Sequence, residues 1–328
     1  MARFGVSFTE PGRRCWYWGA VETGRRIGPD EFRLPGRQGI GGAWFTSLAE
    51  RARSFETEIG AHAALARLLE ECGYDPGSLG IQSMPDLPRS SVIQDGRLRV
   101  PLYHGTSDLF LESIRRRGLG GANPLEPLRA MESLRDLVEW CDLRAESDSG
   151  FASWWSGRRI QMEPTRLQQS SVLNFSNGRT FLTPSRRSAA RYALSNAYGS
   201  EALSEAILLY REAAAHSGSA VDDLPFATPP LLELLDRVTC PILFKAEGVE
   251  VSGLRSEKGA DPVETLRRLD EVWSPSDPDL FEDLTQQESF ELVVPIPADC
   301  LKIYRVVRAG DDLSLPEFSL QPMGEKAP

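Results

Sequence analysis

Three short blocks of this 328-residue chain place a histidine, a tyrosine and a glutamate where each could do chemistry. The first block reads YHGTS and holds His104, whose imidazole can donate or accept a hydrogen bond. The second reads FLTPSRRSAARYA and holds Tyr192, whose ring can stack on a planar ligand. The third reads QESFELVVP, in which Glu291 opens an apolar run and could stabilise a developing positive charge.

The residues that follow His104 strengthen the first block. Gly105 lets another group approach the backbone closely because it has no side chain. The run 108–117 predicts a short helix that stops at Gly118, and the free amide groups of its first turn could bind an anion. A lone histidine at the end of a strand is usually structural, so this block alone indicates no activity.

The second and third blocks each have an ordinary structural interpretation as well. Tyr192 stands among alanines on a predicted helix, where a tyrosine is most often part of the core, although small neighbours also leave room for a flat ring. Glu291 is either an exposed edge residue or a carboxylate held for catalysis. Glu288 is a second candidate acid, and we favour Glu291 because it directly precedes the apolar strand.

Composition argues against several classes of protein. The five cysteines are far apart and form no CxxC pair, so we expect neither a disulfide framework nor a zinc site. With only three histidines, a transition-metal enzyme is not expected. The glycine cluster GRQGIGG at 36–42 matches neither a P-loop nor a dinucleotide fingerprint, which disfavours a hydride-transferring NAD enzyme.

The charge is unevenly distributed along the chain. Residues 201–328 carry 25 acidic and 11 basic side chains, whereas residues 101–200 carry 10 acidic and 13 basic ones. An acidic surface repels phosphates and disfavours duplex binding, but a local basic patch in the middle third could still meet a nucleotide. No apolar run reaches the roughly 18 residues of a membrane helix, and the N-terminus lacks a secretory pattern. We therefore expect a soluble, cytoplasmic protein.

The elements that must position the three blocks follow from local patterns. Strands are predicted over residues 3–8, 15–21, 98–104, 180–183, 242–246, 290–296 and 301–307. Helices are predicted over 108–117, 186–197 with Ser185 as its cap, and 201–215. A further helix is predicted from Ser47 to Gly73, whereas 122–178 show no clear period. Short strands without regular βαβ alternation indicate an α+β fold.

Taken in this order, the three blocks resemble the diphtheria-toxin-like, or His-Tyr-Glu, branch of the ADP-ribosyltransferase superfamily. The resemblance covers residues 98–307, and its first two blocks are more specific than the third. It implies a split antiparallel β-sandwich core with surrounding helices, preceded here by a small α/β N-terminal region. The sister Arg-Ser-Glu branch fits less well, because Glu288 and Glu291 have two residues between them instead of one.

The resemblance also implies a role for each block. His104 would hydrogen-bond a ribose hydroxyl of NAD⁺, the Gly105 backbone would bind the nicotinamide carboxamide, and Tyr192 would stack on the nicotinamide ring. Glu291 would bind the 2′-hydroxyl of the nicotinamide ribose and stabilise the oxocarbenium-like charge of the transition state. Further contacts to NAD⁺ are expected from Thr106, Phe181, Ser185 and Tyr198.

The expected activity is metal-free transfer of a single ADP-ribose from NAD⁺ to a macromolecular acceptor, either protein or nucleic acid. Two alternatives stay open: an NAD⁺ glycohydrolase of the same fold, and a catalytically silent member that serves as a binding module. The resemblance favours a bacterial toxin or phage-defence effector, with an antitoxin or regulatory partner and no membrane partner. Delivery as an effector without a cleaved signal is compatible with the cytoplasmic expectation.

The expected domain organisation has three parts. Residues 1–96 form an N-terminal region that could recognise the target or regulate the site. Residues 97–310 form the catalytic domain, with an insertion at 122–178 that could be a lid, an acceptor-binding element or a structural elaboration. Residues 311–328 form a loose tail. The arginines of the Tyr192 helix, Arg186, Arg187 and Arg191, could face the NAD⁺ pyrophosphate, an acidic acceptor or solvent.

Overall fold

The computed structural model describes the backbone of residues 3–8, 15–22, 25–33 and 52–55. It describes backbone and side chains for 91–123, 126–159, 179–219, 224, 230–257, 262–309 and 318–323. For residues 160–167 and 229 it describes the backbone alone.

The first four strands form one antiparallel sheet. They are β1 (Arg3–Phe8), β2 (Cys15–Glu22), β3 (Arg25–Arg33) and β4 (Ala52–Phe55), in the order β3-β2-β1-β4. The strands predicted at 3–8 and 15–21 are confirmed. The helix predicted from Ser47 is wrong over 52–55, because these residues pair with the edge of β1. The rest of that helix and the glycine cluster at 36–42 lie outside the described residues.

A second antiparallel sheet carries the first block. Its strands are β7 (Leu102–Ser107), β9 (Pro241–Ala246), β12 (Leu301–Arg308) and β13 (Phe318–Pro322), in the order β13-β12-β9-β7. The strands predicted at 242–246 and 301–307 are confirmed. The predicted loose tail is wrong for β13, which pairs with β12 over its whole length. The sequence of β13 has little period, so the partner strand decides its conformation.

A third sheet has three short strands and carries the other two blocks. It contains β10 (Leu254–Ser256), β11 (Phe290–Leu292) and β8 (Thr180–Leu182), in the order β10-β11-β8. A single bridge between Tyr103 and Thr183 connects β8 to the edge strand β7. The two sheets are therefore joined at one point and separate beyond it. A two-stranded hairpin, β5 (Ile93–Gln94) and β6 (Arg97–Leu98), precedes β7.

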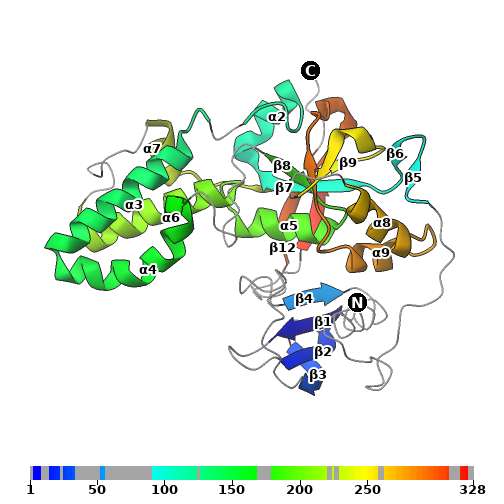
Figure 1. Ribbon diagram of the computed structural model, residues 1–328, viewed down its shortest axis with the longest axis horizontal. Coiled ribbons are helices and arrows are strands. Elements are labelled where there is room, and N and C mark those ends of the chain that lie inside the picture. Colours follow the sequence, from blue (N-terminus) through cyan, green and yellow to red (C-terminus); the bar gives the residue numbers. More distant parts are fainter. Residues whose placement is uncertain are drawn as a thin grey trace.

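The described part of 122–178, a range for which the sequence showed no period, is largely helical. Two long helices, α3 (Ala130–Ser147) and α4 (Ser149–Leu167), pack together and against α6 (Glu201–Ser217). With α7 (Pro229–Leu235) they form a helical lobe beside the sheets, on the left of Figure 1. Trp140, Trp154 and Trp155 of these helices are partly or fully buried and pack in or against the apolar core.

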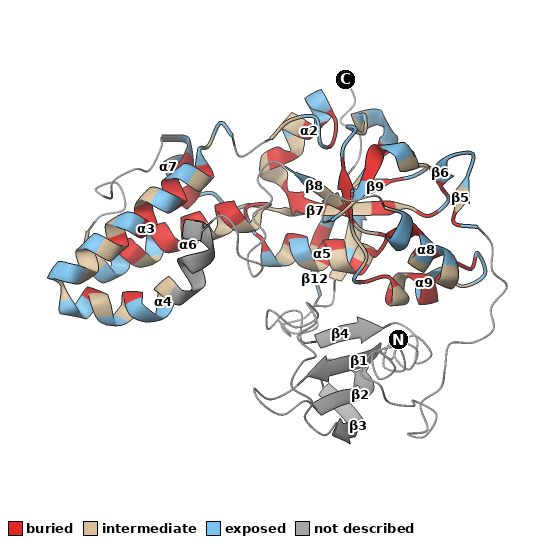
Figure 2. Cartoon of the chain, viewed as in Figure 1, coloured by how far each residue is buried: buried red, intermediate tan, exposed pale blue. Residues whose placement is uncertain are grey.

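Shorter helices cover the sheets. The 3₁₀ turn η4 (Asp108–Phe110) and α2 (Leu111–Arg117) follow β7, and α2 ends at Gly118 with a φ of 80°, as predicted. Helix α5 (Arg186–Ser195) packs on β7 and β9. Helices α8 (Val263–Val272) and α9 (Pro278–Leu284) precede β11. Figure 2 shows the buried residues concentrated along β7 and β9 and on the inner faces of α3 and α6.

The fold is thus of mixed α+β class, with antiparallel sheets that do not close into a barrel. One continuous apolar core links the helical lobe to the sheets, and a smaller core lies between α5 and the second sheet. Within the described residues, no helix combines the length and the apolar character needed to span a membrane.

Candidate functional site

His104 lies where the edge strand β7 separates from β8. Next to it, Tyr103 exchanges two backbone hydrogen bonds with Thr183, at N–O distances of 2.8 and 2.9 Å. The Nδ1 atom of His104 is 2.8 Å from the carbonyl oxygen of Phe181. The imidazole therefore continues the contact between the two strands and occupies the junction of the two sheets.

This hydrogen bond determines the protonation of the imidazole. A carbonyl oxygen can only accept, so the proton sits on Nδ1 of His104. Burial of most of the ring lowers the pKa of His104, and the bond to Phe181 offsets this only in part, so the ring is neutral at pH 7. Its Nε2 atom then presents a lone pair that can accept a hydrogen bond from a hydroxyl group. Within the described part of the chain, no side chain or backbone group bonds to Nε2.

Position 105 requires a glycine because helix α5 packs directly against its backbone. A Cβ atom at this position would lie 1.9 Å from the carbonyl oxygen of Ala189 and 3.1 Å from the backbone nitrogen of Ala193. The close approach that the sequence suggested for a ligand is therefore made by α5. The peptide groups of Gly105 point along the same edge as those of Tyr103, because alternate residues of a strand direct N–H and C=O the same way. Beyond the bridge to Thr183, this edge has no further strand pair with β8.

Glu291 lies in the middle strand of the three-stranded sheet. Its register partners are Phe181 on β8 and Arg255 on β10. Directly opposite residues of antiparallel strands direct their side chains to the same face, so these three form one row across the sheet. The neighbours of Glu291 on its own strand, Phe290 and Leu292, are buried on the other face. Glu291 itself is 9% exposed.

Arg179 holds the Glu291 carboxylate. Its Nη1 atom is 3.3 Å from Oε2 of Glu291, and its own side chain is half-exposed. Arg179 precedes Phe181 by two residues, so the period of a strand directs both to the same face. Neither Arg179 nor Arg255 was identified from the sequence. The strand period around Phe181 could have indicated Arg179, whereas Arg255 needed the pairing of β10 with β11.

The structure also separates the two candidate glutamates. Glu288 lies in the turn before β11 and pairs with Arg268 of α8 at 3.1 Å. Glu291 lies opposite Phe181, the residue whose carbonyl oxygen bonds His104. Phe181 is therefore the common neighbour of His104 and Glu291, and Glu288 faces a different element.

Tyr192 lies on α5 next to the first block. The carbonyl group of Ala189 and the backbone nitrogen of Ala193, the residue after Tyr192, are the parts of the helix that approach Gly105. Tyr192 is 37% exposed, and its hydroxyl group contacts the backbone of Glu201 at the start of α6. Burial of the hydroxyl, together with the negative charge of Glu201, raises the pKa of Tyr192, so the phenol stays neutral. No aromatic ring within the described residues stacks on Tyr192.

Two residues expected to contact NAD⁺ are used inside the protein instead. Thr106 is fully buried, and its hydroxyl group donates to the carbonyl oxygen of Gly199 at 3.1 Å. Ser185 is also fully buried, and its hydroxyl oxygen accepts from the backbone nitrogen of Ser188 at 3.2 Å. This confirms Ser185 as the helix cap and leaves neither hydroxyl exposed to a ligand.

Tyr198 is a third such correction. The helix that carries Tyr192 ends at Ser195, so Tyr198 lies beyond it and not further along it. Tyr198 is 8% exposed, and its hydroxyl oxygen accepts from Nη2 of Arg211 at 3.0 Å. It belongs to the packing between the end of α5 and α6. Phe181, by contrast, is half-buried and lies in the row of Glu291.

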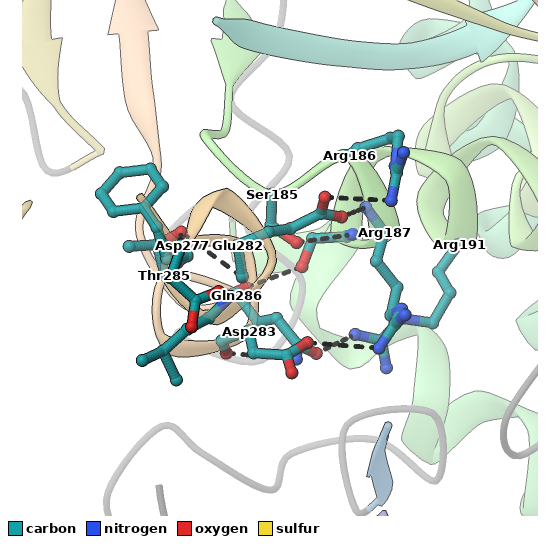
Figure 3. A network of polar contacts seen from close by, with 12 residues as sticks. Ser185, Arg186, Arg187, Arg191, Asp277, Glu282, Asp283, Thr285 and Gln286 are labelled. Atoms are coloured by element: carbon teal, nitrogen blue, oxygen red, sulfur yellow. Dashed lines mark hydrogen bonds and ion pairs between the residues drawn. The ribbon is translucent and has the colours of Figure 1, made fainter. Parts of the chain in front are cut away.

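A polar network joins the start of α5 to α9 (Figure 3). Its buried centre is Arg187, whose backbone nitrogen donates to Oε1 of Glu282 at 2.8 Å. The Nη1 atom of Arg187 lies 3.4 Å from Oδ1 of Asp283, and both side chains are almost fully buried. Arg186 pairs with Glu282 at 3.3 Å. The two helices thus share charges that would be costly to bury singly.

The same network extends into the turn before β11. Arg191 donates through Nη2 to Oε1 of Gln286 at 2.7 Å, and Ser188 donates to the carbonyl oxygen of Gln286 at 2.8 Å. The arginines expected to face a pyrophosphate, an acceptor or solvent therefore hold α9 against α5. The helix of Tyr192 is in this way tied to the segment that leads to Glu291.

The groups left available at the junction are of four kinds: an imidazole acceptor, the peptide groups of a strand edge, a partly exposed tyrosine side chain and a carboxylate. Within the described residues, no three His, Cys, Asp or Glu side chains gather closely enough to hold a metal ion. Cys141, Cys240 and Cys300 are free thiols. Comparisons with protein-family models, with curated proteins and with solved structures found no match to this chain.

Proposed function

We propose that this protein is an NAD⁺-dependent mono-ADP-ribosyltransferase of the His-Tyr-Glu type, and that its two joined sheets are the split antiparallel core of that fold. One observation carries the proposal. His104 and Glu291 come from distant parts of the chain, and both adjoin Phe181, the first by a 2.8 Å hydrogen bond and the second by strand pairing. The order of the blocks in the sequence does not require this juxtaposition.

The edge of β7 suits the nicotinamide end of NAD⁺. A carboxamide has one donor and one acceptor group, and the peptide edge of Gly105 offers one of each. Tyr192 directly precedes Ala193, whose backbone nitrogen approaches Gly105, and is 37% exposed, so the nicotinamide ring would stack on its ring. The lone pair on Nε2 of His104 would accept a ribose hydroxyl. Each group binds or orients the dinucleotide without bonding to it covalently.

Glu291 would act on the bond that breaks. Arg179 holds its Oε2 atom, which leaves Oε1 to accept the 2′-hydroxyl of the nicotinamide ribose. When the bond between C1′ and the nicotinamide nitrogen breaks, the electron pair leaves with nicotinamide and the ribose gains oxocarbenium character. The carboxylate stabilises this charge, which the ground state lacks. The acceptor nucleophile then bonds to C1′ and gives up its proton.

The test compares the wild-type protein with Glu291→Gln and with the matched control Glu288→Gln. Each is incubated with labelled NAD⁺, with and without cell lysate, and both free nicotinamide and macromolecule-bound label are followed. We expect Glu291→Gln to lower nicotinamide release by about 10² to 10³-fold, because it removes a preorganised charge. Glu288→Gln should stay close to wild type, since Glu288 pairs with Arg268 away from the row.

The remaining outcomes separate the alternatives. Release of nicotinamide without labelling of any lysate component would favour an NAD⁺ glycohydrolase. If the protein neither releases nicotinamide nor binds NAD⁺, the result contradicts an enzyme and leaves the binding module as the alternative. The toxin or phage-defence role rests on family resemblance. Growth arrest after induced expression in bacteria, absent with Glu291→Gln, is the result we expect for such an effector.

A further inference from the structure

The three-stranded sheet has one face in the core and one face outside it. Leu182, Leu254 and Phe290 are buried on the core face. The other face carries the row of Phe181, Glu291 and Arg255, because residues paired across the strands share a face. Acceptor molecules that reach Glu291 must therefore pass the side chains of this face.

Two guanidinium groups flank the one carboxylate of the row. Arg255 stands directly across from Glu291, is exposed, and has no ion pair or side-chain hydrogen bond among the described residues. Arg179 contacts Glu291 from the other neighbouring strand and is half-exposed. The next acid along β10 is Glu257, which accepts a hydrogen bond from the Ser289 hydroxyl at 2.7 Å. Arg255 is thus a cation directed outward beside the candidate acid.

We propose that the acceptor is a single-stranded nucleic acid, whose phosphates bind Arg255 and Arg179; this rests on the proposed function. Arginine matches a phosphate with a planar fork of donors and keeps its charge at any working pH. A nucleotide also carries hydroxyl or base nitrogen nucleophiles next to its phosphate, so one residue of the strand can meet both the arginines and C1′.

The charge of the whole protein favours a single strand over a duplex. The chain has a net charge of −10, and residues 201–328 alone carry 25 acidic and 11 basic side chains, so the arginines form a local exception in an acidic protein. A duplex presents phosphates over a wide surface and would meet the acidic regions as well. A single strand can follow a narrow path of arginines, and its base edges are not occupied by pairing.

Binding is tested first without NAD⁺, by fluorescence anisotropy of short labelled DNA and RNA strands. We expect single strands to bind more tightly than the matching duplex or a phosphoserine peptide. Arg255→Gln should weaken binding by about tenfold and lower the slope of log K against log salt by about 0.7, the value for one lost phosphate contact on a single strand. The control is Arg308→Gln, at an exposed arginine of β12, which should leave both quantities unchanged.

Transfer is tested next, as the ratio of label on the strand to nicotinamide released. We expect Arg255→Gln to lower this ratio and Arg308→Gln to preserve it. Equal binding by wild type and Arg255→Gln, or tighter binding of the peptide, would overturn the proposal. A rise in the KM for NAD⁺ with an unchanged ratio would also overturn it, by assigning Arg255 to the pyrophosphate. If strand binding depends on Arg255 but no nicotinamide is released, the result contradicts the proposed transferase and leaves the nucleic-acid-binding surface supported.

Discussion

The helical lobe and the junction of the two sheets use their polar side chains in opposite ways. In the lobe, Arg158 pairs with Glu205 and Glu212 at 2.7 and 2.8 Å, and so joins α4 to α6. At the junction, Nε2 of His104 has no bonding partner among the described residues. Beside Glu291, Arg255 points outward and makes no ion pair within the described part of the chain. Polar groups of the lobe hold helices together, whereas those of the junction keep unused hydrogen-bonding capacity. Such capacity in a buried or half-buried setting is costly for stability and is typical of a binding site.

The network between α5 and α9 lies between these two cases. It adjoins the junction, yet its central pair, Arg187 and Asp283, is almost fully buried and bonded internally, as in the lobe. It therefore serves to position Tyr192 relative to the strand of Glu291. Changes in the three regions should have separable effects on stability and on chemistry.

The largest effect on stability is expected from the buried pair. Arg187→Met leaves the Asp283 carboxylate buried without its cation, which typically costs about 3 to 5 kcal/mol of unfolding free energy. Chemical denaturation followed by circular dichroism measures the loss. Arg267→Met, which removes only exposed pairs with Glu264 and Glu271, is the control and should not change the midpoint. If Arg187→Met lowers the unfolding free energy no more than the control does, the buried network contributes no more to stability than an exposed ion pair.

A smaller effect is expected in the lobe. Arg158→Met removes two partly buried charge-assisted hydrogen bonds, so we expect a loss of about 1 to 2 kcal/mol in unfolding free energy. Nicotinamide release per folded molecule should not change, because no polar group of the junction is touched. A fall in that rate with the fold intact would show that the lobe takes part in the chemistry. It would contradict the distinction between the lobe and the junction.

The smallest effect is a pH dependence from the junction itself. Burial lowers the pKa of His104 from 6.5, so the unfolded chain takes up a proton more readily than the folded one. The stability contributed by neutral His104 is therefore fully present above pH 6.5 and is lost as the pH falls from 6.5 toward the lower folded pKa. Nicotinamide release should be constant above pH 6.5 and decline in the same acidic range, since a protonated Nε2 cannot accept a hydroxyl.

Two variants check this pH dependence. Denaturation at several pH values should show the acidic loss of stability for wild type and a smaller loss for His104→Asn. His216→Gln, at the ring stacked on Trp154 in the lobe at 4.6 Å, is the control and should keep the full dependence. An unchanged acidic loss in His104→Asn would assign the titration to another group.

Elements with strong local signals were predicted well. The strands at 3–8, 15–21, 242–246 and 301–307 are confirmed, as are the helix caps at Ser185 and Gly118. These signals act over a few residues, so the surrounding structure has little scope to override them. The strand predicted at 290–296 is also present, but as a ladder strand it ends at Leu292.

Elements that depend on a distant partner were predicted poorly. The strand β4 pairs with β1 and the strand β13 pairs with β12. No local period in the sequence predicted either strand. The two long helices of the lobe were missed, and they depend on contacts with each other, such as that of Phe151 on α4 with Trp140 on α3. For such segments, tertiary contact outweighs local propensity.

Local patterns were enough to predict the order of the His104, Tyr192 and Glu291 blocks, the helix that carries Tyr192, and the uneven charge. Contacts between distant segments were needed to show that Glu291 and not Glu288 stands across from Phe181, that α5 fills the space beside Gly105, and that Thr106, Ser185 and Tyr198 bond inward. A local pattern reports which residues share a face of a strand or helix. Which element that face meets depends on chain segments far away in the sequence, and so does the chemistry left exposed between them.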